Sequence, residues 1–162
     1  MWIKVFSVTF ALLVFGALAI YGYGSYRWKT ETDAMRARMQ AAKRTHAVRI
    51  YDVKEIDPLP APVQRYFRAA LTPGQAMVAA VDIEITGAMR MSDDTKKWSP
   101  FTSSQRVITQ RAGFDWNASI AMFPGVKAYV HDAYIAGEGI LHAALLGAFT
   151  VAELRGTKNS AH

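Results

Sequence analysis

The chain contains no cysteine and no recognisable catalytic motif. The absence of cysteine excludes disulfide bonds, thiolate metal sites and a cysteine nucleophile, but does not report the compartment. No G-x-S-x-G elbow surrounds Ser103 or Ser104, so nothing indicates a hydrolase nucleophile. The net charge of +6 comes without a helix-turn-helix, zinc or RNA-binding signature. We therefore expect no catalysis, no cofactor and no nucleic-acid partner.

The chain has four histidines. His131 and Asp132 are neighbours in a predicted strand, where adjacent side chains point to opposite faces, so they do not form a dyad. We interpret His131, which shares its face with Tyr129 and Ile135, as a half-buried surface histidine, and Glu138 as a turn residue between two glycines. No two histidines have the spacing of a metal motif such as H-E-x-x-H, so we expect no metal site. The four histidines are His46, His131, His142 and His162.

The one long hydrophobic run, Val5–Gly24, has no charged residue. As a helix rising ~1.5 Å per residue it is ~30 Å long, which matches the hydrocarbon core of a bilayer. Trp2 precedes it and Tyr21 stands near its end, and such aromatic rings favour the lipid–water boundary. A signal peptide cleaved near Ala19 is the alternative, but the apolar run continues past that point, which favours an uncleaved single-pass anchor.

Basic residues come directly after the anchor and indicate contact with anionic headgroups, at about 1 kcal/mol each near the surface. They also favour a cytoplasmic location for the rest of the chain. A short basic start with Lys4, however, also suits an anchor that exports the domain attached to it, so the side of the membrane stays open. The expected membrane-surface residues are Arg27, Lys29, Arg36, Arg38, Lys43 and Arg44.

Beyond the anchor, residues 27–49 are predicted to form a solvated juxtamembrane helix, with a headgroup-binding or partner-binding helix as the alternative. A proline-rich lead-in then precedes a short helix at 62–71, whose apolar stripe of Val63, Tyr66, Phe67 and Leu71 predicts packing on a sheet. We divide the chain into an anchor (1–28), a basic helix and linker (29–57) and a sheet domain (58–162).

From residue 79 the hydrophobic period changes from 3.6 to 2. Strands are predicted near 79–91, 98–110, 114–122 and 127–135, joined by short turns, which gives an antiparallel meander. Residues 140–151 are apolar on both faces and fit a buried strand or a helix. The expected fold class is α+β, with one curved antiparallel sheet packed with the short helix.

Four segments together resemble a bacterial family of membrane-anchored proteins known only as a domain of unknown function. They carry its L-P-x-P-V-x-R-Y helix, its W-x-x-F and G-F-x-W strands and a later apolar segment. The segments are LPAPVQRYFRAAL (Leu59–Leu71), WSPFTSSQ (Trp98–Gln105), GFDWNASIAMFPG (Gly113–Gly125) and DAYIAGEGILHAALLGAFTVA (Asp132–Ala152).

The resemblance implies the bacterial inner membrane as the location and a fold like the LolA-type lipoprotein carriers, in which a curved sheet cups apolar ligands. Members of the family continue with a further helix and strands, whereas this chain ends in the polar tail RGTKNSAH. We therefore expect a truncated domain with an open sheet edge.

These observations lead to the hypothesis of a membrane-anchored, non-catalytic protein that binds an apolar or lipid-like ligand. The alternative is an interaction or scaffold protein whose open sheet edge pairs with a partner. A third reading, an enzyme, requires Asp132, Glu138 and His131 to converge in one cleft. The residues expected to line the ligand cavity are Phe101, Phe114, Trp116, Met122 and Tyr134.

Overall fold

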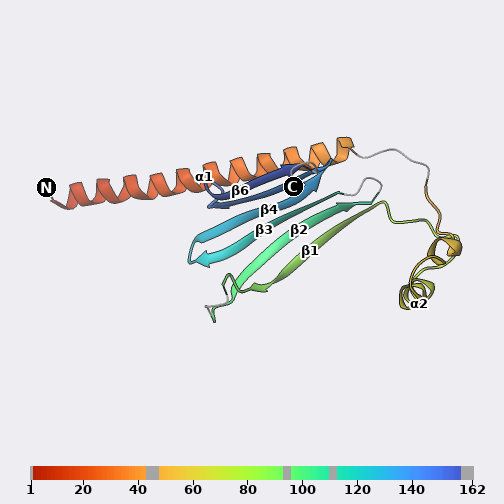
Figure 1. The fold of residues 1–162 in the computed structure, drawn as a ribbon. Helices are drawn as coiled ribbons and strands as arrows, with labels where there is room; N and C mark the ends of the chain where they lie inside the picture. The colour runs from red at the N-terminus through yellow and green to blue at the C-terminus, as the bar shows by residue number, and fades with distance from the viewer. Residues whose placement is uncertain (1, 43–47, 93–95, 110–112, 158–162) are drawn as a thin grey trace.

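The computed structural model describes residues 2–42, 48–92, 96–109 and 113–157. A single long helix, α1 (Trp2–Ala42), begins at the N-terminus and is followed by a short 3-10 helix, η1 (Val53–Ile56), and by α2 (Ala61–Ala70). The remaining elements are strands of one sheet, along which the second half of α1 runs (Figure 1). The α+β prediction is confirmed.

The sheet is a six-stranded antiparallel meander in the order β1-β2-β3-β4-β5-β6. Each strand pairs with its neighbours in sequence because the connecting turns are short. The strands are β1 (Ala80–Met89), β2 (Ser99–Ile108), β3 (Gly113–Phe123), β4 (Val126–Ile135), β5 (Glu138–Leu145) and β6 (Phe149–Thr157).

The ambiguous segment 140–151 is neither one strand nor a helix. It contains the end of β5, a turn at Leu146–Gly147 and the start of β6. Leu146 and Gly147 have φ angles of 54° and 71°, which reverse the chain, and glycine adopts such angles without strain. Residues 155–157, the start of the predicted polar tail, belong to β6.

The helix packed on the sheet is α1. Its buried residues are Gly24, Trp28, Thr32, Met35 and Met39, which recur about once per turn and form one stripe. Met35 and Met39 lie in a core cluster with Ile108, Ala133, Ile135 and Ile140. The juxtamembrane segment is therefore not solvated on all sides as we expected, because this stripe covers β3 and β4.

The short helix α2 does not pack over the sheet, contrary to our expectation. None of its residues is buried, and its main contacts are with η1. Val63 and Tyr66, from its apolar stripe, are 37% and 67% exposed. Phe67 and Leu71 line a hollow at the end of the sheet with Val78. α2 stands at the end of the molecule opposite the N-terminus (Figure 1).

Gly24 marks the point at which α1 meets the sheet. A Cβ atom there would lie 2.0 Å from the Leu146 carbonyl oxygen, whereas at Gly22, one half-turn earlier, it would meet nothing within 4 Å. We predict that G24A lowers the free energy of unfolding by about 1–3 kcal/mol, because the backbone must move apart. Urea unfolding in detergent, followed by tryptophan fluorescence, measures this.

The control is G22A, which gains helix propensity of up to ~1 kcal/mol and no clash. Equal stability of the two variants would show that α1 does not pack against the β5–β6 turn at this position.

Candidate functional site

The two faces of the sheet differ in chemistry. On the face that contacts α1, polar and titratable side chains such as Asp115, Asn117 and His131 are covered by the helix. The opposite face is mainly apolar and is called the apolar face below. By strand alternation and register its members are Val81, Ile83, Ile85, Phe101, Val107, Phe114, Trp116, Ala118, Ile120, Val130, Tyr134, Leu141 and Leu154.

The structure brings four of the five expected cavity residues onto the apolar face. Phe101 and Trp116 have ring centroids 6.5 Å apart. Phe114 and Tyr134 are opposite each other in β3 and β4 and line a hollow of about 490 Å³. Met122 lies at the irregular end of β3 and lines a separate hollow. The four residues thus share an open surface, and no described hollow contains all five.

On the other face, Trp28 of α1 anchors the helix to β3 and β4. Its indole Nε1 donates a hydrogen bond to Asn117 Oδ1 at 3.0 Å, and its ring stacks on His131 with centroids 4.0 Å apart and planes 3° from parallel. A polar hollow of about 360 Å³ opens beside it, bordered by Glu84, Ser104 and Tyr129 among others.

Arg36 forms an ion pair with a fully buried carboxylate, that of Asp115. Its Nε donates to Asp115 Oδ2 at 2.8 Å and its second guanidinium nitrogen to Ser104 Oγ at 2.8 Å. The Asp115 side chain is 0% exposed, while that of Arg36 is 31% exposed. Burial raises the pKa of Asp115, and the hydrogen bond from Arg36 opposes that rise.

Other expected membrane-surface residues also contact the sheet. Arg27 donates to the Ala148 carbonyl at 2.9 Å, and Arg38 pairs with Glu138 at 2.6 Å. Lys29 pairs with Asp33 along its own helix, and its side chain is 75% exposed. Lys43 and Arg44 lie outside the described residues. Contact of these basic residues with lipid headgroups stays a prediction.

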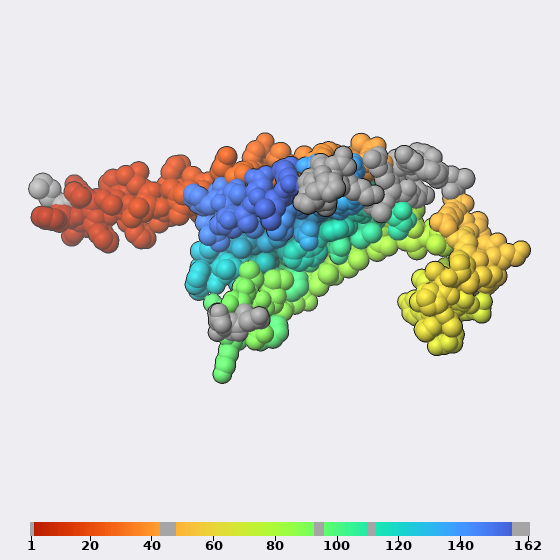
Figure 2. Space-filling model, viewed as in Figure 1, coloured from red at the N-terminus to blue at the C-terminus, as the bar shows by residue number. Residues whose placement is uncertain are grey.

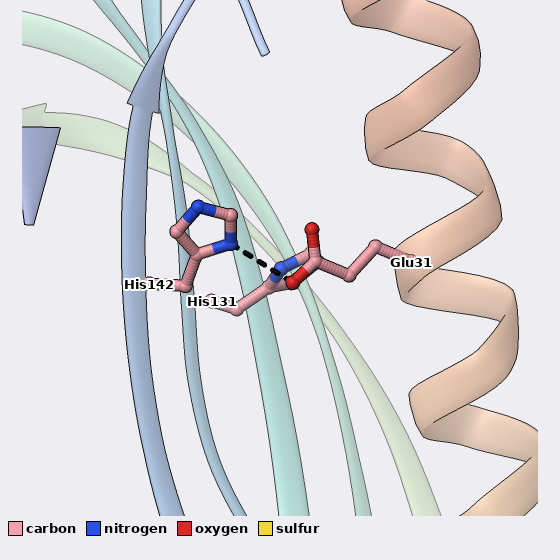
Figure 3. Close-up of side chains that lie close together, drawn as sticks. All are labelled: Glu31, His131 and His142. Atoms are coloured by element: carbon pink, nitrogen blue, oxygen red, sulfur yellow. Dashed lines mark hydrogen bonds and ion pairs between the residues drawn. The ribbon is translucent and has the colours of Figure 1, made fainter. Parts of the chain in front are cut away.

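Two histidines and a glutamate meet between α1 and the sheet (Figure 3). His131 in β4 and His142 in β5 are directly opposite in the register, and Glu31 reaches them from α1. One ring nitrogen of each histidine and one oxygen of Glu31 all lie within 4.8 Å of one another. His142 Nδ1 is 2.9 Å from Glu31 Oε1 and its Nε2 is 3.1 Å from Thr150 Oγ1.

Sequence reasoning missed this cluster. His131 is 0% exposed and not a half-buried surface residue, because α1 covers it. Burial, with His142 and Arg36 acting in the same direction, lowers its pKa to about 3. A signal was present in the sequence: both histidines are equally far from the Ala136–Gly137 turn, so hairpin pairing predicts that they meet. Asp132, by contrast, lies on the apolar face, opposite Leu141.

With this geometry established, comparison with known proteins places the chain in a family. The chain belongs to a family of unknown function, DUF6920, whose model matches residues 57–162. The resemblance described from the motifs is thereby confirmed, and the matched range includes the whole sheet. No curated protein and no solved structure matches the chain. The likeness to LolA-type carriers therefore stays a prediction.

The Arg36–Asp115 pair yields a test of the packing of α1. We predict that R36Q lowers the free energy of unfolding at pH 7 by roughly 3 kcal/mol, because it leaves a buried carboxylate without its cation. This loss in the free energy of unfolding should become smaller as the pH falls. Burial holds the pKa of Asp115 in the folded state above its value in the unfolded state, so protonation of this carboxyl favours the folded state. Urea unfolding at several pH values measures both effects.

R38Q is the matched control, because Arg38 makes a more exposed pair on the same helix. It should cost less than about 1 kcal/mol. An R36Q deficit that is no larger than that of R38Q, or that grows toward acid pH, would contradict the prediction.

Proposed function

We propose that the protein is a single-pass, membrane-anchored member of its family that holds an apolar or lipid-like ligand on the apolar face of its sheet. One observation carries the proposal. The sheet has a broad apolar surface on which no helix packs in the described part of the chain, and one continuous helix joins the sheet to a segment long enough to cross a bilayer.

The apolar face is unusual in its exposure. Ile83 and Ile85 of β1 are each 38% exposed, and Leu154 of β6 is 66% exposed. Contiguous apolar surface of this kind on a protein commonly marks a binding site for a partner, a ligand or a membrane. Aromatic rings from β2 and β3 lie in its centre and offer flat contact area to acyl chains.

The anchor supports a lipid-like ligand over other apolar molecules. The first half of α1 projects clear of the sheet as an apolar rod (Figure 2), and its residues before Gly24 are almost all exposed. Tyr21, near the end of this segment, lines a hollow with Lys97 and Phe123 at the β3–β4 turn. That turn therefore lies next to the point where α1 leaves the bilayer, and the apolar face begins close to the lipid headgroups.

An uncleaved anchor is part of the proposal. The helix does not end where the apolar segment ends but continues to Ala42 and supplies the core residues Trp28, Met35 and Met39. This arrangement holds the sheet at a fixed distance from the membrane, which a flexible linker would not do. On the basis of the family resemblance, we place the anchor in the bacterial inner membrane.

The test is lipid extraction and mass spectrometry on the detergent-purified chain, comparing I85K with T86K. Both substitutions add one positive charge to β1, but Ile85 lies on the apolar face and Thr86 on the opposite one. We expect bound lipid to be lost in I85K and kept in T86K, because a lysine in an apolar site carries a large desolvation cost.

Recovery of no lipid from the unaltered protein would overturn the proposal. A dimer that I85K dissociates, seen by light scattering, would identify a second copy of the chain as the occupant in place of a lipid.

An interaction or scaffold role is the second candidate, and the edges of the sheet favour it. Among the described residues, the first and last strands, β1 and β6, each pair with one neighbour. An unpaired edge offers free backbone donors and acceptors to a further strand. The length of β1, ten residues fully paired to β2, makes it the better template.

For this second role we predict that a photo-crosslinking amino acid at Glu84 in β1 captures one defined membrane protein in cells, whereas the same group at exposed Tyr66 in α2 does not. Gel electrophoresis and mass spectrometry identify the products. Crosslinks to the chain itself alone would count against a partner at this edge.

A further inference from the structure

The cluster of Glu31, His131 and His142 has the composition of a transition-metal site. Two imidazoles and one carboxylate are ligands that Zn²⁺ and similar divalent ions prefer, and three protein ligands leave a fourth position for water. Two of the three are almost completely buried: His131 is 0% and His142 2% exposed. Buried polar groups normally have hydrogen-bond partners, so a cluster of buried titratable side chains needs an explanation.

Hydrogen bonding leaves one nitrogen of His131 without a partner. Thr32 Oγ1 donates its only hydrogen to the Trp28 carbonyl at 2.9 Å, so it accepts the hydrogen bond from His131 Nε2 at 2.8 Å. Nε2 then carries the proton of a neutral ring, and Nδ1 has a free lone pair. That Nδ1 is buried and has no hydrogen-bond partner.

The second histidine is held in a similar way. Thr150 Oγ1 lies 3.1 Å from His142 Nε2, while His142 Nδ1 faces Glu31 Oε1 at 2.9 Å. Metal-binding histidines usually donate their other ring N–H to an oxygen, which fixes the tautomer and the ring orientation. Thr32 and Thr150 are placed to accept such bonds, one for each ring. Figure 3 shows the two rings and the carboxylate gathered between α1 and the strands.

The distances between the three ligand atoms can be compared with those around a bound tetrahedral ion. Ligands of a tetrahedral ion with bonds of ~2.0–2.1 Å are ~3.3 Å apart. The His142–Glu31 distance of 2.9 Å is shorter than this, and the three ligand atoms lie within 4.8 Å of one another. The Glu31 side chain is 24% exposed, so the cluster is open to solvent on the side of this residue.

We propose that Glu31, His131 and His142 bind a divalent transition metal, with Zn²⁺ as the ion to test, and that this ion fastens α1 to β4 and β5. The site joins residues from three elements, and Glu31 lies outside the range that the family model matches. The inference does not depend on lipid binding, since the cluster is on the face of the sheet opposite the apolar face.

The experiment measures Zn²⁺ stoichiometry and affinity on the full chain in detergent, by elemental analysis after dialysis and by competition with a chromophoric chelator. The chain carries no histidine tag, and His46 and His162 are replaced by glutamine in every sample so that they do not bind the ion. We expect one Zn²⁺ per chain and a higher melting temperature with Zn²⁺ than with Mg²⁺, because an ion that binds only the folded state stabilises it.

The decisive variant is E31Q, which keeps an oxygen acceptor for His142 but removes the charge of the ligand. We expect it to bind Zn²⁺ at least ~100-fold more weakly, the upper end of what changes around a metal site cost. The control is D33N, which makes the same change in charge on the same helix at an exposed residue paired with Lys29. It should bind Zn²⁺ within about twofold of the unaltered chain.

A Co²⁺ spectrum of the unaltered chain provides a second measurement that does not depend on the folding of a variant. Visible absorption typical of a four-coordinate nitrogen and oxygen site supports the proposal. Absence of those bands, no bound Zn²⁺, or equal affinity of E31Q and D33N would overturn it and leave the cluster as a hydrogen-bonded group alone.

Discussion

The packing of the second half of α1 against one face of the sheet is the interaction on which the rest of the structure depends. A single apolar stripe from Gly24 to Met39 covers β3 and β4, and it includes the Trp28 ring that lies flat on His131. Because the same helix begins as the apolar segment, this packing also fixes the position of the sheet relative to that segment.

This packing divides the sheet into two faces with separate roles. The face under α1 holds the charged and titratable groups, where Arg36 neutralises buried Asp115 and Glu31 meets two histidines. On the face away from α1, the aliphatic side chains of Ile83, Ile85 and Leu154 are exposed, whereas Ile120 near its centre is buried. The face under α1 also carries the core cluster of Ile108, Ala133, Ile135 and Ile140. The opposite, mainly apolar face has no helix packed on it in the described part of the chain, and this is the basis of the ligand-binding proposal.

Much of the fold could be predicted because its signals are local. Alternation placed the first four strands, turn residues placed their hairpins, and the absence of charge located the segment that is long and apolar enough to cross a membrane. Errors arose where two elements compete for one surface. The stripe on α2 predicts packing on a sheet as clearly as the stripe on α1 does, yet α2 remains exposed. Only the tertiary structure decides which helix occupies the face, since both stripes have the same period.

The candidate sites also divide into features that local sequence patterns predict and features that only tertiary packing decides. Sequence alone determined that Phe101, Phe114, Trp116 and Tyr134 share a face, because register is set by short antiparallel hairpins. It also predicted strand β4 with His131 and Tyr129 on the same side. The sequence did not predict that Glu31, on a helix far away in the chain, lies next to two paired histidines. Long-range docking creates that cluster, and no local pattern encodes the rotation of α1 on the sheet.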